Sequence, residues 1–167
     1  MKKAMITVGV AALLLTGCGG GVELSEEDTV RVAQYAADLV LKYDSNYKEL
    51  MLPEGDILCF SGDIMSSGHN EGELIHFLKW VSKQPFKYKI FIAGNHDRLL
   101  EDKRLLADEI ISCYQKDGVV YLNNTSFEVD GIKFYGCPHQ PYFCNWAFNV
   151  PDTNKLTTIY QQIPDDT

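Results

Sequence analysis

Two short apolar runs, each followed directly by polar side chains, constrain the fold of this 167-residue chain more than any other feature. The run at residues 89–93 reads Lys-Ile-Phe-Ile-Ala and predicts a buried β-strand. The sequence Gly-Asn-His-Asp follows at 94–97, and residues 98–102 then have the character of a helix start. A strand, a polar loop and a helix in this order are typical of α/β proteins, whose ligands bind at the C-terminal ends of parallel strands.

The second apolar run lies about thirty residues earlier, at 56–60, and ends in Ser-Gly-Asp. If the two strands are neighbours, Asp63, Asn95 and His96 lie close together at one edge of the sheet. Carboxylate and amide oxygens with an imidazole nitrogen suit Mn, Fe, Zn or Mg. The pattern therefore predicts a divalent-metal site.

Each of these residues also has an ordinary structural explanation. Asp63 could be a turn residue or a helix N-cap, because Asp after Gly is common at both positions. Asn95 could adopt a left-handed turn conformation, and His96 could be a surface or packing histidine. The joint spacing and the flanking strands favour the functional interpretation.

Apolar periodicity and turn residues predict the following elements: helices over 71–83 and 99–114, short strands at 119–121, 127–129 and 132–136, and a hairpin turn at 130–131. The order changes from strand–helix units to antiparallel pairing. This pattern predicts an α/β fold.

At its polar loops the chain resembles the calcineurin-like metallophosphoesterases. Residues 62–63 are similar to the second motif of that family, and residues 94–97 are similar to the third. Further segments resemble the branch of small metallophosphoesterase-domain proteins: 52–56, 136–141, 145–149 and 163–166. The resemblance covers roughly residues 49–167 and implies a partial two-sheet sandwich flanked by helices.

The resemblance also implies a chemistry, in which two divalent metals activate a bridging water that attacks a phosphomonoester or phosphodiester. Asp63 would bridge the metals and Asn95 would bind the second one. His96 would face the phosphoryl group of a small phosphoester and protonate the leaving oxygen. Asp97 would hold the His96 ring by a hydrogen bond.

Other family motifs are missing from this sequence. The first motif, Asp-x-His, is not found before Leu52, and Asp44 is the nearest substitute as a metal ligand. The later histidines that complete both metal shells in the family do not occur before Thr167. His139 follows a predicted strand and is a further candidate ligand, although a role in the pocket wall is favoured because Trp usually occupies this position in the branch. We therefore expect weak or no activity.

Residues 1–21 resemble a bacterial lipoprotein signal. Two lysines precede an apolar stretch at 4–15, and Leu-Thr-Gly-Cys at 15–18 resembles a lipobox. Cys18 would then carry a lipid and hold the protein at the membrane on the extracytoplasmic side. An N-terminal anchor helix with a chance cysteine is the alternative, and without a genuine leader the location would be cytoplasmic.

Three parts follow from these patterns: the signal segment and spacer at 1–21, a helical segment of unclear origin at 22–48, and a truncated phosphoesterase domain at 49–167. Two alternatives to an enzyme remain. One is a non-catalytic, lipid-tethered binding protein, and the other is a truncated or misjoined product without activity.

Charge and cysteine content add two limits. A net charge of -8 argues against a nucleic-acid surface, which is usually basic. The five cysteines form no Cys-x-x-Cys motif, and Cys59 lies in a predicted strand where a reduced, buried thiol fits. The sequence leaves open whether Cys59, Cys113, Cys137 and Cys144 form disulfides, and it leaves open the oligomeric state.

Overall fold

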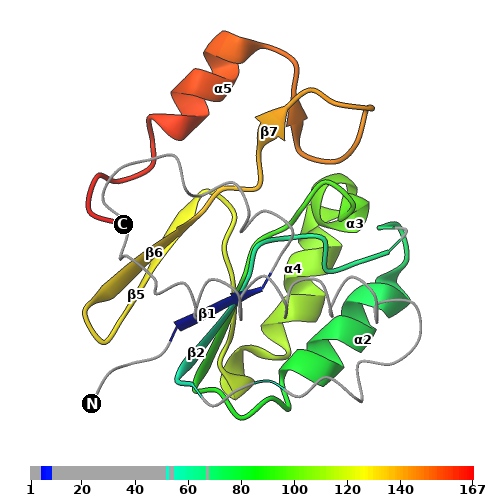
Figure 1. Ribbon diagram of the computed structural model, residues 1–167. Coiled ribbons are helices and arrows are strands. Elements are labelled where there is room, and N and C mark those ends of the chain that lie inside the picture. The colour runs from blue at the N-terminus through cyan, green and yellow to red at the C-terminus, as the bar shows by residue number, and fades with distance from the viewer. Residues whose placement is uncertain (1–4, 9–51, 53–54, 67) are drawn as a thin grey trace.

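A four-stranded parallel sheet lies at the centre of the computed structural model, which describes residues 5–8, 52, 55–66 and 68–167 (Figure 1). Its order is β1-β2-β3-β4. The strands are β1 (Met5–Val8), β2 (Ile57–Phe60), β3 (Tyr88–Phe91) and β4 (Val119–Tyr121). The predicted strands at 56–60, 89–93 and 119–121 are confirmed as neighbours, so β2 and β3 end side by side.

Three helices cover one face of this sheet: α2 (Glu71–Val81), α3 (Arg98–Asp102) and α4 (Arg104–Ser112) (Figure 1). The Asn70 side chain caps α2 by accepting a hydrogen bond from the Gly72 N–H at 2.7 Å. The Phe77 ring of α2 packs edge-on against Phe60 and Phe91 of the sheet, at centroid distances of 5.2 and 5.4 Å. Burial of these rings fixes the helix layer on the sheet.

The predicted single helix at 99–114 is divided in the structure. Lys103 has φ -125° and ψ 47°, so the helical hydrogen bonding is interrupted between α3 and α4. Leu105, an apolar residue of the predicted helix, is 87% exposed. The spacing did not show this break, because Leu100, Ala107 and Ile111 are buried in the divided helix and also share one face of a continuous one.

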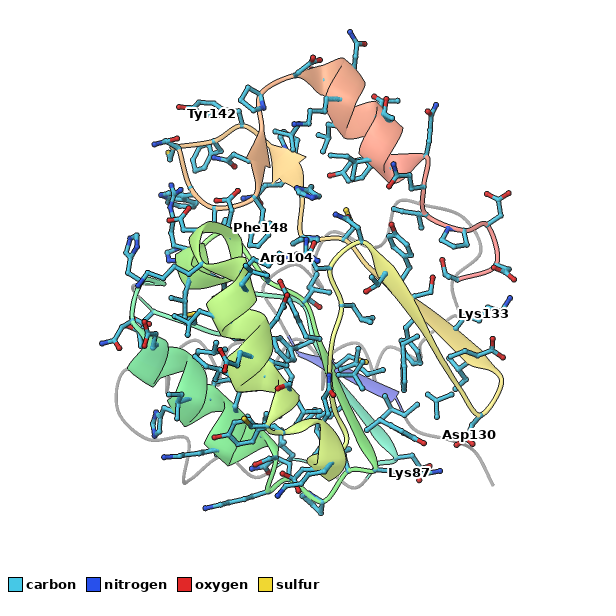
Figure 2. The ribbon with its side chains drawn as sticks, turned by 180° about the vertical axis from the view of Figure 1, so that it is seen from behind. Lys87, Arg104, Asp130, Lys133, Tyr142 and Phe148 are labelled. Atoms are coloured by element: carbon cyan, nitrogen blue, oxygen red, sulfur yellow. The ribbon has the colours of Figure 1, made fainter. Side chains whose placement is uncertain are left out.

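A β-hairpin covers part of the opposite face of the sheet. It consists of β5 (Thr125–Val129) and β6 (Ile132–Gly136), paired antiparallel as predicted. Asp130 and Gly131 have φ values of 53° and 77°, as a tight two-residue turn requires. Lys87 forms an ion pair of 3.9 Å with Asp130, and Figure 2 shows the two side chains together at the hairpin tip.

A second apolar cluster joins the hairpin to the sheet. Ile57 and Ile90 of the sheet pack with Leu122 and Val129. The described residues therefore form a mixed α/β fold, with helices on one face of a parallel sheet and a hairpin on the other.

The last part of the chain was not predicted in detail. It contains β7 (Gln140–Pro141) paired with β8 (Asn149–Val150), followed by α5 (Thr153–Tyr160). Earlier in the chain, a short 3-10 helix, η3 (Gln115–Asp117), precedes β4 and was not predicted either. The Asp152 side chain caps α5 by accepting hydrogen bonds from the Asn154 and Lys155 N–H groups at 2.8 and 3.3 Å. Figure 1 shows α5 and β7 beyond the edge at which the sheet strands end.

The N-terminal segment differs in one respect from the expectation. Met5–Val8, inside the predicted signal segment, pairs in parallel with β2. Its sequence Met-Ile-Thr-Val is rich in β-branched residues, which favour strands. Residues 9–51 lie outside the described ranges, so the lipidated Cys18, the helical segment at 22–48 and the candidate ligand Asp44 stay predictions.

Within the described ranges, every helix is too short or too polar to cross a bilayer.

Lys89 is a buried charge at the opposite end of β3 from the polar loop. Its side chain is 4% exposed, and Nζ donates hydrogen bonds to the carbonyl oxygens of Phe86 at 2.9 Å and Asp117 at 2.6 Å. Burial lowers the pKa of this ammonium group, while the nearby Asp117 carboxylate raises it. Lys89 therefore links the turn before β3 to the turn before β4.

Replacing Lys89 with Met should lower the free energy of unfolding by about 2 kcal/mol, because the carbonyl groups of Phe86 and Asp117 lose their donor while the cost of burying a charge is relieved. Urea denaturation would measure the change. Lys83→Met, at an exposed position, is the matched control. Equal stability of the two variants would contradict the linking role of Lys89.

Candidate functional site

The loops that follow β2 and β3 touch each other through their main chains. A Cβ placed on Gly62 would lie 2.6 Å from the Cα atom of Gly94, and one placed on Gly94 would collide with the Asp63 carboxylate. Gly62 also has φ 105°, which side chains disfavour. Both glycines are therefore needed for the two polar motifs to meet.

Asp63 is anchored at this contact. It has φ 52°, and its Oδ1 atom accepts a hydrogen bond from the backbone N–H of His96 at 3.0 Å. The structure thus brings Asp63 to the loop that carries Asn95 and His96, as the strand order predicts. This hydrogen bond crosses between two loops, so Asp63 is more than a local turn residue.

The imidazole of His96 is exposed beside this contact. Its Nδ1 atom lies 3.4 Å from the carbonyl oxygen of Ser66, and its ring lies 5.0 Å from the ring of Trp146. The neighbouring Asn95 is partly exposed, and its backbone carbonyl accepts a hydrogen bond from the Ala147 N–H at 3.0 Å. An exposed imidazole next to a fixed carboxylate is suited to exchange protons with a bound ligand.

Asp97 has a role beyond the predicted one. Its carboxylate is 0% exposed and accepts three backbone hydrogen bonds: from Gly94 at 2.7 Å, Met65 at 2.8 Å and Ile64 at 3.3 Å. His96 directs its Nδ1 atom to Ser66 instead of to Asp97. Asp97 therefore joins the loops after β2 and β3, and its predicted hydrogen bond to the His96 ring stays a prediction.

Burial raises the pKa of the Asp97 carboxyl to about 7. The Gly94 N–H lowers it in part, the Asp63 charge raises it, and the Met65 and Ile64 N–H groups lower it. Three donors around one carboxylate explain how the group is accommodated in the interior.

His139, the further candidate ligand, contacts Asn124 and Phe148. Its Nε2 atom is 2.9 Å from the Asn124 side-chain nitrogen, and its ring packs edge-on against Phe148 at 5.9 Å. Burial lowers the pKa of this imidazole, while the Glu101 charge raises it. These contacts agree better with a place in the wall of the pocket than with a role of His139 as a metal ligand.

The described residues supply only some of the ligands that a metal ion would need. Asp63 and Asn95 supply oxygen donors on adjacent loops, but within residues 52, 55–66 and 68–167 no three His, Cys, Asp or Glu side chains gather as a metal site. Catalytic metals generally need about three protein ligands. The described donors therefore fit part of a metal site, and Asp44 lies outside the described ranges.

The four described cysteines, Cys59, Cys113, Cys137 and Cys144, are free thiols. Burial raises the pKa of the Cys59 thiol in β2 to about 12, so this thiol is a poor nucleophile.

Sequence reasoning missed the two residues that attach the 142–148 loop to the site, Arg98 and Glu101. Arg98 donates to the backbone carbonyl of Asn145, and Glu101 accepts from the Phe148 N–H at 3.0 Å. Both contacts join residues 47 positions apart, and no local pattern signals them.

Replacing Asp97 with Asn should lower the free energy of unfolding by about 1–3 kcal/mol. The amide NH2 group can accept nothing, so at least one of the three backbone N–H groups must face another donor. Chemical denaturation of Asp97→Asn against the exposed control Asp102→Asn would measure this. A loss no larger than that of the control would contradict the joining role.

The sequence profile described as calcineurin-like phosphoesterase matches residues 32–166. Metallophosphoesterase domain-containing protein 1 of Homo sapiens and its Mus musculus counterpart are each 31% identical over 135 residues, covering 70% of this chain and 41% of the relative. A protein of Emericella nidulans named probable rhamnogalacturonate lyase C is 37% identical over 131 residues, covering 74% of this chain and 12% of that protein.

The chain thus spans about two fifths of the length of the metallophosphoesterase relatives. The matched residues include both touching loops, with Asp63 on the first and Asn95 and His96 on the second. From the extent of this match, the chain belongs to the calcineurin-like phosphoesterase family.

Proposed function

We propose that the touching loops after β2 and β3 form a site for metal-dependent hydrolysis of phosphoesters. The observation that carries this proposal is the hydrogen bond from the His96 N–H to the Asp63 carboxylate, at the contact of Gly62 with Gly94. It fixes a carboxylate next to an exposed imidazole in a chain of the phosphoesterase family.

In this proposal the side-chain oxygens of Asp63 and Asn95 hold a divalent metal, which is Mn, Fe, Zn or Mg. A bound metal supplies Lewis acidity and lowers the pKa of water. His96 faces the phosphoryl group and gives a proton to the leaving oxygen. Asp97 keeps the two loops at a constant separation through its backbone hydrogen bonds.

Two donors fall short of a full ligand set, so further ligands come from outside the described residues. Asp44 is the candidate within this chain. The substrate is a small phosphomonoester or phosphodiester, and the complete fold is the two-sheet sandwich of the family. Slow turnover is expected, because a loosely held metal stabilises less charge in the transition state.

The test uses the full chain with added Mn. Metal content and the release of p-nitrophenol from p-nitrophenyl phosphate and its bis ester are measured together. We expect slow, Mn-stimulated hydrolysis that falls about a hundredfold in His96→Ala, which removes the proton donor. Asp63→Asn should reduce both the bound metal and the turnover.

His69→Ala is the matched control, because His69 is an exposed imidazole before α2. Its rate should equal that of the unchanged protein. Absence of metal uptake and turnover in a folded protein would overturn the proposed function. Turnover that survives His96→Ala would overturn the role of His96.

A further inference from the structure

An exposed aromatic loop stands next to His96. Trp146 is 39% exposed, and its ring lies 5.0 Å from the His96 ring at an interplanar angle of 51°. Phe143 packs edge-on against Trp146 at 5.2 Å, and Tyr142 lies at the outer rim of the loop (Figure 2). Trp146 therefore covers one side of the exposed His96 imidazole.

Among the described residues, the polar contact of the His96 ring is weak. Its polar contact, 3.4 Å from Nδ1 to the Ser66 carbonyl oxygen, is at the long limit of a hydrogen bond. Exposed side chains change rotamer freely. Packing against the broad, stiff indole of Trp146 restricts the ring to fewer orientations.

Three contacts hold the loop against the motif that carries His96. The Ala147 N–H donates to the Asn95 carbonyl at 3.0 Å, and the Phe148 N–H donates to Glu101 Oε1 at 3.0 Å. Arg98 donates from Nη2 to the Asn145 carbonyl oxygen. Each contact joins the 145–148 segment to the loop after β3 or to α3, which follows that loop.

Arg98 and Glu101 also form an ion pair of 3.6 Å with each other, one helical turn apart on α3. Each partner fixes the other while it binds the loop, so the two side chains act as one clamp. Their charges are partly exposed, and for that reason the contact to the loop backbone matters more than the ion pair itself.

The loop needs such a clamp because its backbone is strained. Cys144, Asn145 and Phe148 have φ values of 52°, 51° and 56°. Left-handed conformations of residues other than glycine persist where the surrounding contacts enforce them. Phe148 is 3% exposed, and Figure 2 shows it on the inner side of the loop near α3 and α4.

We propose that Trp146 is a positioning residue for the His96 imidazole, and that Arg98 and Glu101 hold Trp146 in place. This inference rests on the proposed function, in which His96 donates a proton. Trp146 acts through His96 and takes no proton itself.

The first test reads the contact without any metal. The chain has two tryptophans, so Trp80→Phe leaves Trp146 as the single indole emitter. The packing of the His96 ring against Trp146 shields part of the indole from a soluble quencher. At constant pH, the quenching constant of Trp146 with acrylamide should therefore rise when this contact is lost.

Three variants in that background decide the interpretation. His96→Ala should raise the acrylamide quenching constant of Trp146, and Arg98→Ala and Glu101→Gln should each cause at least about half of that rise, because the loop is no longer clamped. Arg104→Ala is the matched control, since Arg104 is exposed on α4 and pairs with Asp108 at 3.6 Å. A quenching constant that is unchanged in His96→Ala, or that is unchanged in both clamp variants, overturns the proposal.

The second test is the division between kcat and KM for p-nitrophenyl phosphate. Trp146→Leu should lower kcat about tenfold with KM nearly unchanged, and Trp146→Phe should restore part of the loss. A rise in KM at constant kcat would mean that Trp146 contacts the substrate, which overturns the positioning role. If the unchanged protein shows no turnover, the proposed function fails, and the fluorescence alone decides whether Trp146 and the clamp orient His96.

Discussion

The buried carboxylate of Asp97 is the interaction on which the polar loops depend. It accepts backbone hydrogen bonds from the loop after β2, at Ile64 and Met65, and from the loop after β3, at Gly94. A single side chain thus satisfies three buried donors that have no partner in the sheet. Asp63 and His96 lie on opposite sides of this junction, so their separation follows from a group that need not touch a substrate.

Much of the fold could be predicted because its signals are local. Apolar runs marked β2 and β3, and the Asp130–Gly131 pair marked the hairpin turn. The break at Lys103 could not be predicted, since the buried positions on either side fit one continuous helix as well. Apolar periodicity reports which face is buried and says little about where a helix is interrupted.

Part of the candidate site could likewise be predicted from the sequence, and part could not. The meeting of Asp63 with the 94–97 loop follows from parallel neighbouring strands, which the motifs indicated. The hydrogen-bond partners of Asp97 could not be predicted from the sequence. They are backbone N–H groups, which every residue except proline carries, so the identity of the partner residues gives no signal. The clamp of Arg98 and Glu101 depends on a chain segment 47 positions away, which no short pattern encodes.

The contact between Gly62 and Gly94 has a wider consequence for which positions of the site accept a substitution. The two main chains approach closely at these glycines, while the Asp63 and Asp97 side chains tie the loops together. A side chain at either glycine position would push the two loops apart and displace Asp63 from His96.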